Sequence, residues 1–151
     1  MAPVLAVEDL TVTLTRPGGR VPVLERLSFS VEAGRTVALV GESGCGKSMT
    51  ALAIMGLLPE GFARAGGRVL LAGEDIAAAK PARLRALRGS ALSMIFQEPM
   101  TALNPVYTVG DQIAEALRLH ERHGHRAALE RALAMLRAVQ MPAAERRRHA
   151  Y

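Results

Sequence analysis

The chain has 151 residues, half of them hydrophobic, so its length allows one domain with a core and argues against two complete domains. Its formal charge of +5 comes almost entirely from arginine and is compatible with nucleic acid, anionic lipid or small anionic ligands without selecting among them. A single cysteine excludes an internal disulfide framework, and the longest apolar run, Ala51 to Leu58, is far shorter than the roughly 18 residues of a membrane-spanning helix.

The first part of the sequence predicts strands followed by a helix. Alternating apolar and polar residues predict a half-buried strand from Val4 to Leu14, and the turn Pro17 to Gly19 separates it from a second strand over Val21 to Phe29. The continuously apolar segment Thr36 to Val40 predicts a buried central strand. Apolar residues then recur at helical spacing over Met49 to Leu58, so we expect strand, loop and helix in that order.

The second part changes from mixed structure to helices. Glycines around an apolar run predict a strand or hairpin over Ala65 to Ile76, and a short basic helix is expected over Pro81 to Leu87. The apolar segment Ala91 to Phe96 predicts another strand. From Asp111 onward, three-and-four spacing predicts amphipathic helices with a break near Gly124.

Between the expected central strand and helix lies a glycine-rich loop that matches G-x-x-x-x-G-K-[ST] at every fixed position. Backbone N–H groups in such a loop, at the start of a helix, form a positive concavity for phosphate oxygens. We expect Lys47 to neutralise charge on the β- and γ-phosphates and the Ser48 hydroxyl to coordinate Mg²⁺. The predicted nucleotide-binding residues, called the phosphate loop below, are Gly41, Glu42, Ser43, Gly44, Cys45, Gly46, Lys47 and Ser48.

A second motif connects this loop to a family. The run from Met94 to Gly110 resembles the Q-loop region of ABC ATPases, and its part from Glu98 to Pro105 is similar to subunits that drive oligopeptide, dipeptide and nickel import. The segments 40–48, 88–89 and 110–113 fit the same group, so the resemblance covers nearly the whole chain. It implies an α/β fold: a P-loop NTPase ABC-type nucleotide-binding domain with an antiparallel β-subdomain and the start of the helical subdomain, incomplete.

The resemblance also implies which residues form each subdomain and which residues act in the site. Residues 1–105 would form part of the catalytic core and the β-subdomain, with both loops, and residues 106–151 would begin the α-helical subdomain. Gln97 would contact Mg²⁺ or the attacking water, and its loop would carry the signal to a permease. The predicted catalytic residues are thus Lys47 and Gln97, the predicted metal contacts Ser48 and Gln97, and the cofactors ATP and Mg²⁺. Leu14 stands where the family usually has an adenine-stacking aromatic residue.

Partners and location follow from the same resemblance. We expect a peripheral protein on the cytoplasmic face of the cell membrane that powers peptide import. Its partners would be a second ABC ATP-binding subunit, in a homo- or heterodimer, two membrane permease subunits and, through the complex, an extracytoplasmic solute-binding protein. The family's signature sequence, its Mg²⁺-binding aspartate with the following glutamate, and its switch histidine do not occur in these 151 residues. The chain alone is therefore expected to bind ATP without hydrolysing it.

Two alternatives stay open at this point. An ABC ATPase acting on DNA would suit the basic charge, although the sequence has no interleaved aromatic and basic residues, and we expect no nucleic-acid partner. A non-functional truncated product would transport nothing. A metal site at His120, His123 and His125 is not expected, because no carboxylate or cysteine completes the set and Gly124 breaks the helix.

Overall fold

The computed structural model describes residues 3–97, 103–121 and 123–151. The chain forms two compact units, Met1–Arg88 and Gly89–Tyr151. Each unit is described by itself below. The boundary that the sequence suggested, between a catalytic core with its β-subdomain over residues 1–105 and a helical subdomain over residues 106–151, stays a prediction.

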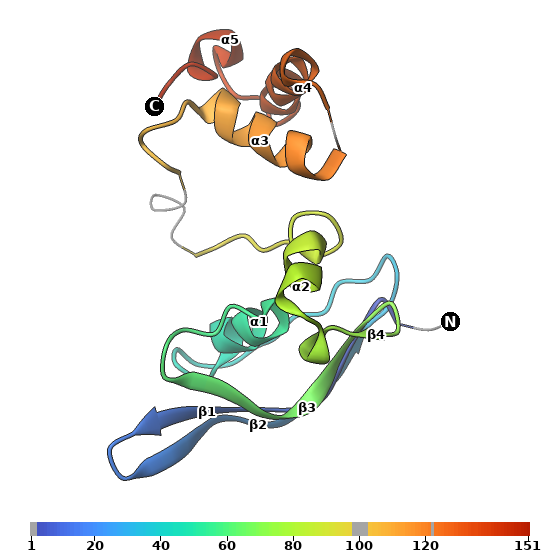
Figure 1. Cartoon of the computed structure of the whole chain (residues 1–151), viewed down its shortest axis with the longest axis vertical. Coiled ribbons are helices and arrows are strands. Elements are labelled where there is room, and N and C mark those ends of the chain that lie inside the picture. Colours follow the sequence, from blue (N-terminus) through green and yellow to red (C-terminus); the bar gives the residue numbers. More distant parts are fainter. Residues whose placement is uncertain (1–2, 98–102, 122) are drawn as a thin grey trace. The chain divides into compact units, whose positions relative to one another are not determined.

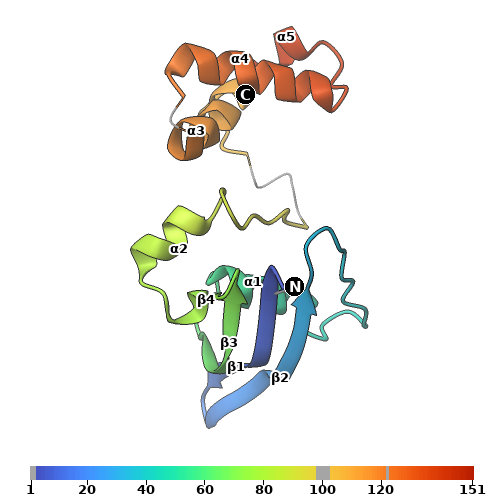
Figure 2. The same ribbon diagram turned by 90° about the vertical axis from the view of Figure 1, so that its right-hand side faces the viewer.

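The first unit is built on an antiparallel sheet. Its strands are β1 (Leu5–Arg16), β2 (Gly19–Val31), β3 (Phe62–Leu71) and β4 (Glu74–Asp75). They lie in the order β2-β1-β3-β4, so β1 is central and pairs with both long neighbours (Figure 2). Leu10 and Val12 of β1 are fully buried, as the alternating pattern predicted, whereas Leu14 is only half-buried. Val7 is buried as well, although the register shift before Leu10 takes it out of that alternation. The two expected N-terminal strands and the hairpin of β3 and β4 are confirmed.

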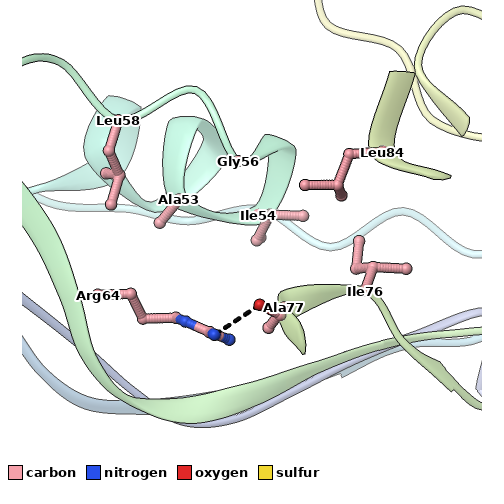
Figure 3. Close-up of a pocket in the computed structure, with 8 residues that line it drawn as sticks. All are labelled: Ala53, Ile54, Gly56, Leu58, Arg64, Ile76, Ala77 and Leu84. Atoms are coloured by element: carbon pink, nitrogen blue, oxygen red, sulfur yellow. Dashed lines mark hydrogen bonds between the residues drawn. The ribbon is translucent and has the colours of Figure 1, made fainter. Parts of the chain in front are cut away.

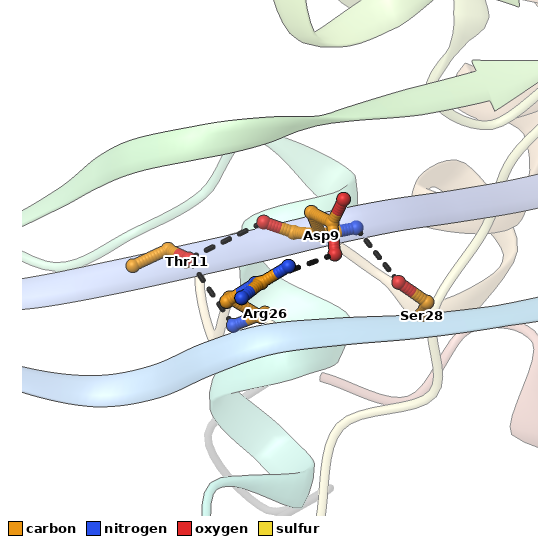
Figure 4. A network of polar contacts seen from close by, with 4 residues as sticks. All are labelled: Asp9, Thr11, Arg26 and Ser28. Atoms are coloured by element: carbon orange, nitrogen blue, oxygen red, sulfur yellow. Dashed lines mark hydrogen bonds and ion pairs between the residues drawn. The ribbon is translucent and has the colours of Figure 1, made fainter.

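Near their middle, the three long strands are irregular (Figure 4). Asp9 in β1 and Arg26 in β2 both have φ of 48°, in register shifts that interrupt the pairing. Asp9 N donates to Ser28 Oγ at 2.8 Å, and Thr11 Oγ1 accepts from Arg26 N at 3.2 Å. On β3, a Cβ at Gly67 would lie 2.5 Å from the Asp9 carbonyl oxygen, so only glycine fits beneath this bulge.

Two helices accompany the sheet in the first unit. α1 (Lys47–Met55) lies over one face of the sheet (Figure 1), and α2 (Pro81–Leu87) follows the short 3-10 helix η1 (Ile76–Ala78). α1 ends at Gly56, whose φ of 64° allows its N–H to bond back into the last turn. Arg88 also donates to the Met55 and Gly56 carbonyls at 2.9 and 2.8 Å, placing a cation at the negative end of α1.

The second unit is helical. Its helices are α3 (Val109–Glu121), α4 (His125–Ala138) and α5 (Ala144–Arg147). Small residues let α3 and α4 pack closely, and the core they form consists of Ala114, Leu117, Ala128 and Ala132. The two amphipathic helices and their separation near Gly124 are thus confirmed. In the parts of the chain that the structure describes, no helix is both long and apolar enough to cross a membrane.

Polar contacts tie the end of the second unit to its first helix. The amides of Val109 and Gly110 donate to the carbonyls of Ala150 and Arg148 at 2.9 and 2.8 Å, so the start of α3 is capped by backbone from the other end of the unit. Arg137 on α4 bonds Glu145 on α5 at 2.6 Å, and this hydrogen bond holds the pKa of the Glu145 carboxyl below its ordinary value.

Two strands expected from the sequence do not form. Thr36 to Val40 has no strand pairing and lies largely in solvent, with Val40 93% exposed, and Ala91 to Phe96 has only an isolated bridge at Leu92. An apolar run indicates which side chains prefer burial, but a strand also needs a neighbouring backbone to bond. The sheet of the described residues contains β1 to β4 only, so neither segment is one of its strands.

Candidate nucleotide-binding site

The phosphate loop leads directly into α1, as the motif requires. Gly44 has φ of 84° and Gly46, the N-cap of α1, has φ of 94°, a region that side chains with a Cβ rarely adopt. The loop therefore depends on glycine at these two inner positions. The first amides of the helix have no acceptor within it, so they are available to an anion at this end. The strand expected before the loop is absent, whereas the helix after it is confirmed.

Gly46 rests directly on the sheet. A Cβ built at Gly46 would lie 2.5 Å from Leu24 Cδ2 and 3.5 Å from the Val23 carbonyl oxygen of β2. Leu24 is buried and comes two residues before the irregular position Arg26. The bulged strand β2 thus packs against the phosphate loop at Gly46, where there is room for a hydrogen atom but not for a Cβ.

The Lys47 side chain folds back over its own loop. Its Nζ donates to the carbonyls of Gly41 at 2.8 Å and Glu42 at 2.6 Å, and lies 3.3 Å from Cys45 Sγ. Both oxygen acceptors are neutral carbonyls, so they orient the ammonium without cancelling its charge. The arrangement gathers a cation and helix-start amides in one loop, which is the combination that binds phosphate groups.

Thr50 and Leu24 belong to the site although the sequence analysis did not single them out. Thr50 is 2% exposed, its backbone N–H donates to the Gly46 carbonyl at 2.8 Å, and its Oγ1 donates to the same oxygen at 3.0 Å. It thereby fastens the last loop glycine to the first helical turn. A threonine four residues after Gly46 is a recognisable signal for such a bond. Leu24 carries no local signal, because its role comes from tertiary packing.

The remaining predicted residues are placed as follows. Ser48 is the second residue of α1 and the last residue of the phosphate loop, and it is exposed. Gln97 belongs to the second unit and is exposed, so its approach to the phosphate loop stays a prediction. Residues 98–102, which include Glu98, lie outside the described residues. Leu14 is half-buried near the end of β1, opposite Val21 of β2 and Phe62 of β3.

A small cavity of about 180 Å³ lies beneath the other end of α1 (Figure 3). It is lined mainly by apolar side chains from α1, η1 and α2, among them Ile54, Ile76 and Leu84. Arg64 of β3 reaches into it and donates to the Ala77 carbonyl at 2.6 Å. No residue of the phosphate loop lines this cavity, so it is separate from the candidate nucleotide site.

The histidines of the second unit do not belong to a metal-binding group in the described parts of the chain. Among residues 3–97, 103–121 and 123–151, no group of three or more histidine, cysteine, aspartate or glutamate side chains is arranged to hold a metal ion. His123 instead lies 2.8 Å from the Glu121 carboxylate, on the surface of the second unit.

Comparison with known protein families shows to which family the chain is related. The model of the family described as "ABC transporter" matches residues 24–150, which include the phosphate loop and Gln97. The chain belongs to the ABC transporter family. This family assignment, and the resemblance to oligopeptide and dipeptide transport subunits, are confirmed.

Curated members of the ABC transporter family are similar to the chain over nearly all its length. It is 47% identical to the dipeptide transport ATP-binding protein DppD of Bacillus subtilis, over 94% of this chain and 43% of that protein. It is 46% identical to the oligopeptide transport ATP-binding protein OppD of Escherichia coli, over 97% of this chain and 43% of that protein. The chain therefore spans less than half the length of these relatives.

Solved structures agree on the ABC fold. The chain superimposes on the dimeric structure of MJ0796, a bacterial ABC transporter cassette, with a TM-score of 0.83 at 20% identity, over 97% of this chain and 60% of that one. A second structure of the same cassette, in a post-hydrolysis state bound to ADP and Pi, gives a TM-score of 0.80 at 19% identity. The predicted fold class, an ABC-type nucleotide-binding domain with an antiparallel sheet and helices, is confirmed.

Proposed function

We propose that the chain is the ATP-binding part of an ABC importer of peptides and that the ATP phosphates bind to the phosphate loop. The observation that carries this proposal is the geometry of that loop, where two glycines of positive φ lead into α1 and the Lys47 ammonium lies against the Gly41 and Glu42 carbonyls. Peptide as the transported solute is supported by the names of the relatives, which are dipeptide and oligopeptide transport ATP-binding proteins.

Each residue of the site has a role in this proposal. Backbone amides of the loop and the Lys47 ammonium hold the β- and γ-phosphates. The Ser48 hydroxyl and the Gln97 amide oxygen are hard oxygen donors of the kind that Mg²⁺ prefers, and Gln97 is proposed to reach the metal or the attacking water from the second unit. The bound metal would neutralise phosphate charge during hydrolysis.

The proposed transporter requires partner subunits. The chain would pair with a second ABC ATP-binding subunit, and the pair would act on two permease subunits from the cytoplasmic face of the membrane. Support comes from the dimeric state of the MJ0796 cassette and from the transport function in the relatives' names. The 151 residues on their own are proposed to bind ATP without turning it over, because the sequence holds no carboxylate assigned to water activation.

Uptake in cells tests this function. Bacteria that carry this gene are given a radiolabelled tripeptide, and initial uptake is compared among wild type, Lys47→Ala and Lys80→Ala. Lys80 is the other lysine of the chain and lies exposed before α2, which makes it a matched control. We expect Lys47→Ala to lose ATP-dependent uptake and Lys80→Ala to retain it. Wild-type uptake in the Lys47→Ala strain would contradict the proposal.

Turnover by the purified chain is a separate test. Phosphate release from MgATP is compared between the wild type and Lys47→Ala. We expect equal, background rates in both proteins. A Lys47-dependent rate above background would overturn the claim that this chain does not hydrolyse ATP by itself.

A further inference from the structure

The cavity beneath the end of α1 has an apolar interior and one charged side. Ile54 and Ile76 are buried, and Ala53 and Leu84 add further apolar surface to the lining (Figure 3). Arg64 of β3 is the charged member of the lining, and it is exposed. All of these residues belong to the first unit, so the cavity is formed within one compact part of the chain.

The volume of the cavity suits a small molecule. It measures about 180 Å³, whereas an engineered apolar cavity of about 150 Å³ in another protein stays dry and binds benzene. An apolar group of about five carbon atoms therefore fits inside. Burial of such a group is favourable, because each methylene removed from water strengthens binding roughly fourfold.

Arg64 supplies the polar side of the cavity. One of its terminal nitrogens donates to the Ala77 carbonyl at 2.6 Å, which holds the guanidinium against the cavity. That acceptor is neutral and leaves the charge in place, whereas Arg68 of the same strand pairs with the Glu8 carboxylate. A guanidinium has further N–H donors in the same plane, and a pair of them matches the two oxygens of a carboxylate. The site is therefore complementary to an anion.

The lining also indicates which ligands fit poorly. None of the residues that line the cavity, all within the described part of the chain, is acidic. The Asp75 carboxylate caps η1 by accepting from Ala77 N at 3.0 Å, and Asp75 does not line the cavity. A free amino acid would bring an ammonium group close to the Arg64 guanidinium with no carboxylate to balance it. A carboxylate on a short apolar chain suits both the charged side and the apolar interior.

We propose that this cavity binds a small aliphatic monocarboxylate, with the carboxylate on the Arg64 guanidinium and the apolar chain against Ile54 and Ile76. The site goes beyond the proposed ATP-binding function and does not depend on it. It lies at the opposite end of α1 from the phosphate loop and shares no residue with that loop, so the carboxylate and ATP do not compete for the same groups.

Titration of the purified chain with pentanoate, followed by the NMR signals of its methyl groups, tests the site. We expect saturable shifts at Ile54, Ile76 and Leu84. Affinity should rise roughly fourfold for each methylene from propanoate to pentanoate and stop rising at octanoate, which outgrows the cavity. Absence of saturable shifts, or shifts confined to residues outside the lining, would overturn the proposal.

The role of the charge is tested on the wild type with probes of matched chain length. Pentanoate is expected to bind at least about tenfold more tightly than 1-pentanol, because the charged hydrogen bonds to Arg64 are made only by the carboxylate. Pentylamine and leucine should bind more weakly than pentanoate. Equal affinity for pentanoate and 1-pentanol would show an apolar cavity without anion recognition and would contradict the proposal.

Three variants locate the site. Arg64→Gln should weaken pentanoate binding at least about tenfold and leave 1-pentanol binding unchanged. Arg68→Gln is the matched control, since it removes the same charge from the same strand, and it should change neither. Ala53→Leu fills the cavity and should abolish binding of both probes. Wild-type pentanoate affinity in Arg64→Gln or in Ala53→Leu, or an equal loss in Arg68→Gln, would place the carboxylate elsewhere.

Discussion

Replacing Gly46 by alanine perturbs the phosphate loop without removing any group that contacts nucleotide. Alanine at the φ of 94° costs about 1–2 kcal/mol in backbone strain. Its Cβ would also lie 2.5 Å from Leu24 Cδ2, and forcing a methyl group into such a packed contact costs about 1–3 kcal/mol more. Because the Val23 carbonyl closes the other side at 3.5 Å, the loop is expected to move away from β2 and to lose its phosphate-binding geometry.

Gly44→Ala is the matched control, since Gly44 has a similar φ of 84° but no atom within 4 Å of a built Cβ. Urea unfolding should show a loss of about 1–2 kcal/mol for Gly44→Ala and of about 2–5 kcal/mol for Gly46→Ala. Adding Leu24→Ala should recover part of the difference in a double-mutant cycle. Equal losses for the two glycine variants, or strict additivity with Leu24→Ala, would refute the contact between the loop and β2.

Two further predictions concern the ends of the nucleotide site. Cys45 is exposed within the phosphate loop, so a thiol reagent should modify it and bound ATP should protect it; equal labelling rates with and without ATP, followed by mass spectrometry, would contradict this. Leu14→Tyr should strengthen ATP binding roughly two- to tenfold, because an aromatic ring stacks on adenine where leucine offers only apolar contact. Unchanged affinity in a fluorescent-ATP titration, with Leu14→Val as control, would remove Leu14 from the site.

Local signals in the sequence predicted much of the first unit. The turn between β1 and β2 consists of Pro17 and Gly18, within the expected range, and the apolar alternation of β1 correctly identified Leu10 and Val12 as buried. Helix α2 begins at Pro81 and ends at Leu87, as predicted, because proline at the first position signals a helix start. These features depend on residues close together in the chain, which explains why the sequence was sufficient.

Features that depend on distant residues were not predictable in the same way. Thr36 to Val40 has the apolar composition of a central strand, but composition does not reveal which backbone would pair with it. The contact of Gly46 with Leu24 joins residues more than twenty positions apart and has no sequence signature.

The phosphate loop could be predicted from sequence because its motif is contained in eight consecutive residues. Positive φ at Gly44 and Gly46 and the placement of Lys47 over the loop agree with that motif. Gln97 is different, since its role requires an approach to the loop from another unit of the chain. The proposed contact of Gln97 with Mg²⁺ or the attacking water therefore rests on the family resemblance alone.

Titration of the purified chain with MgATP by isothermal calorimetry tests the central claim most directly. The account predicts one saturable site in the wild type, binding at least about tenfold weaker in Lys47→Ala, and wild-type binding in Lys80→Ala. Equal ATP affinity in the wild type and Lys47→Ala would contradict the assignment of the phosphate site to the loop from Gly41 to Ser48.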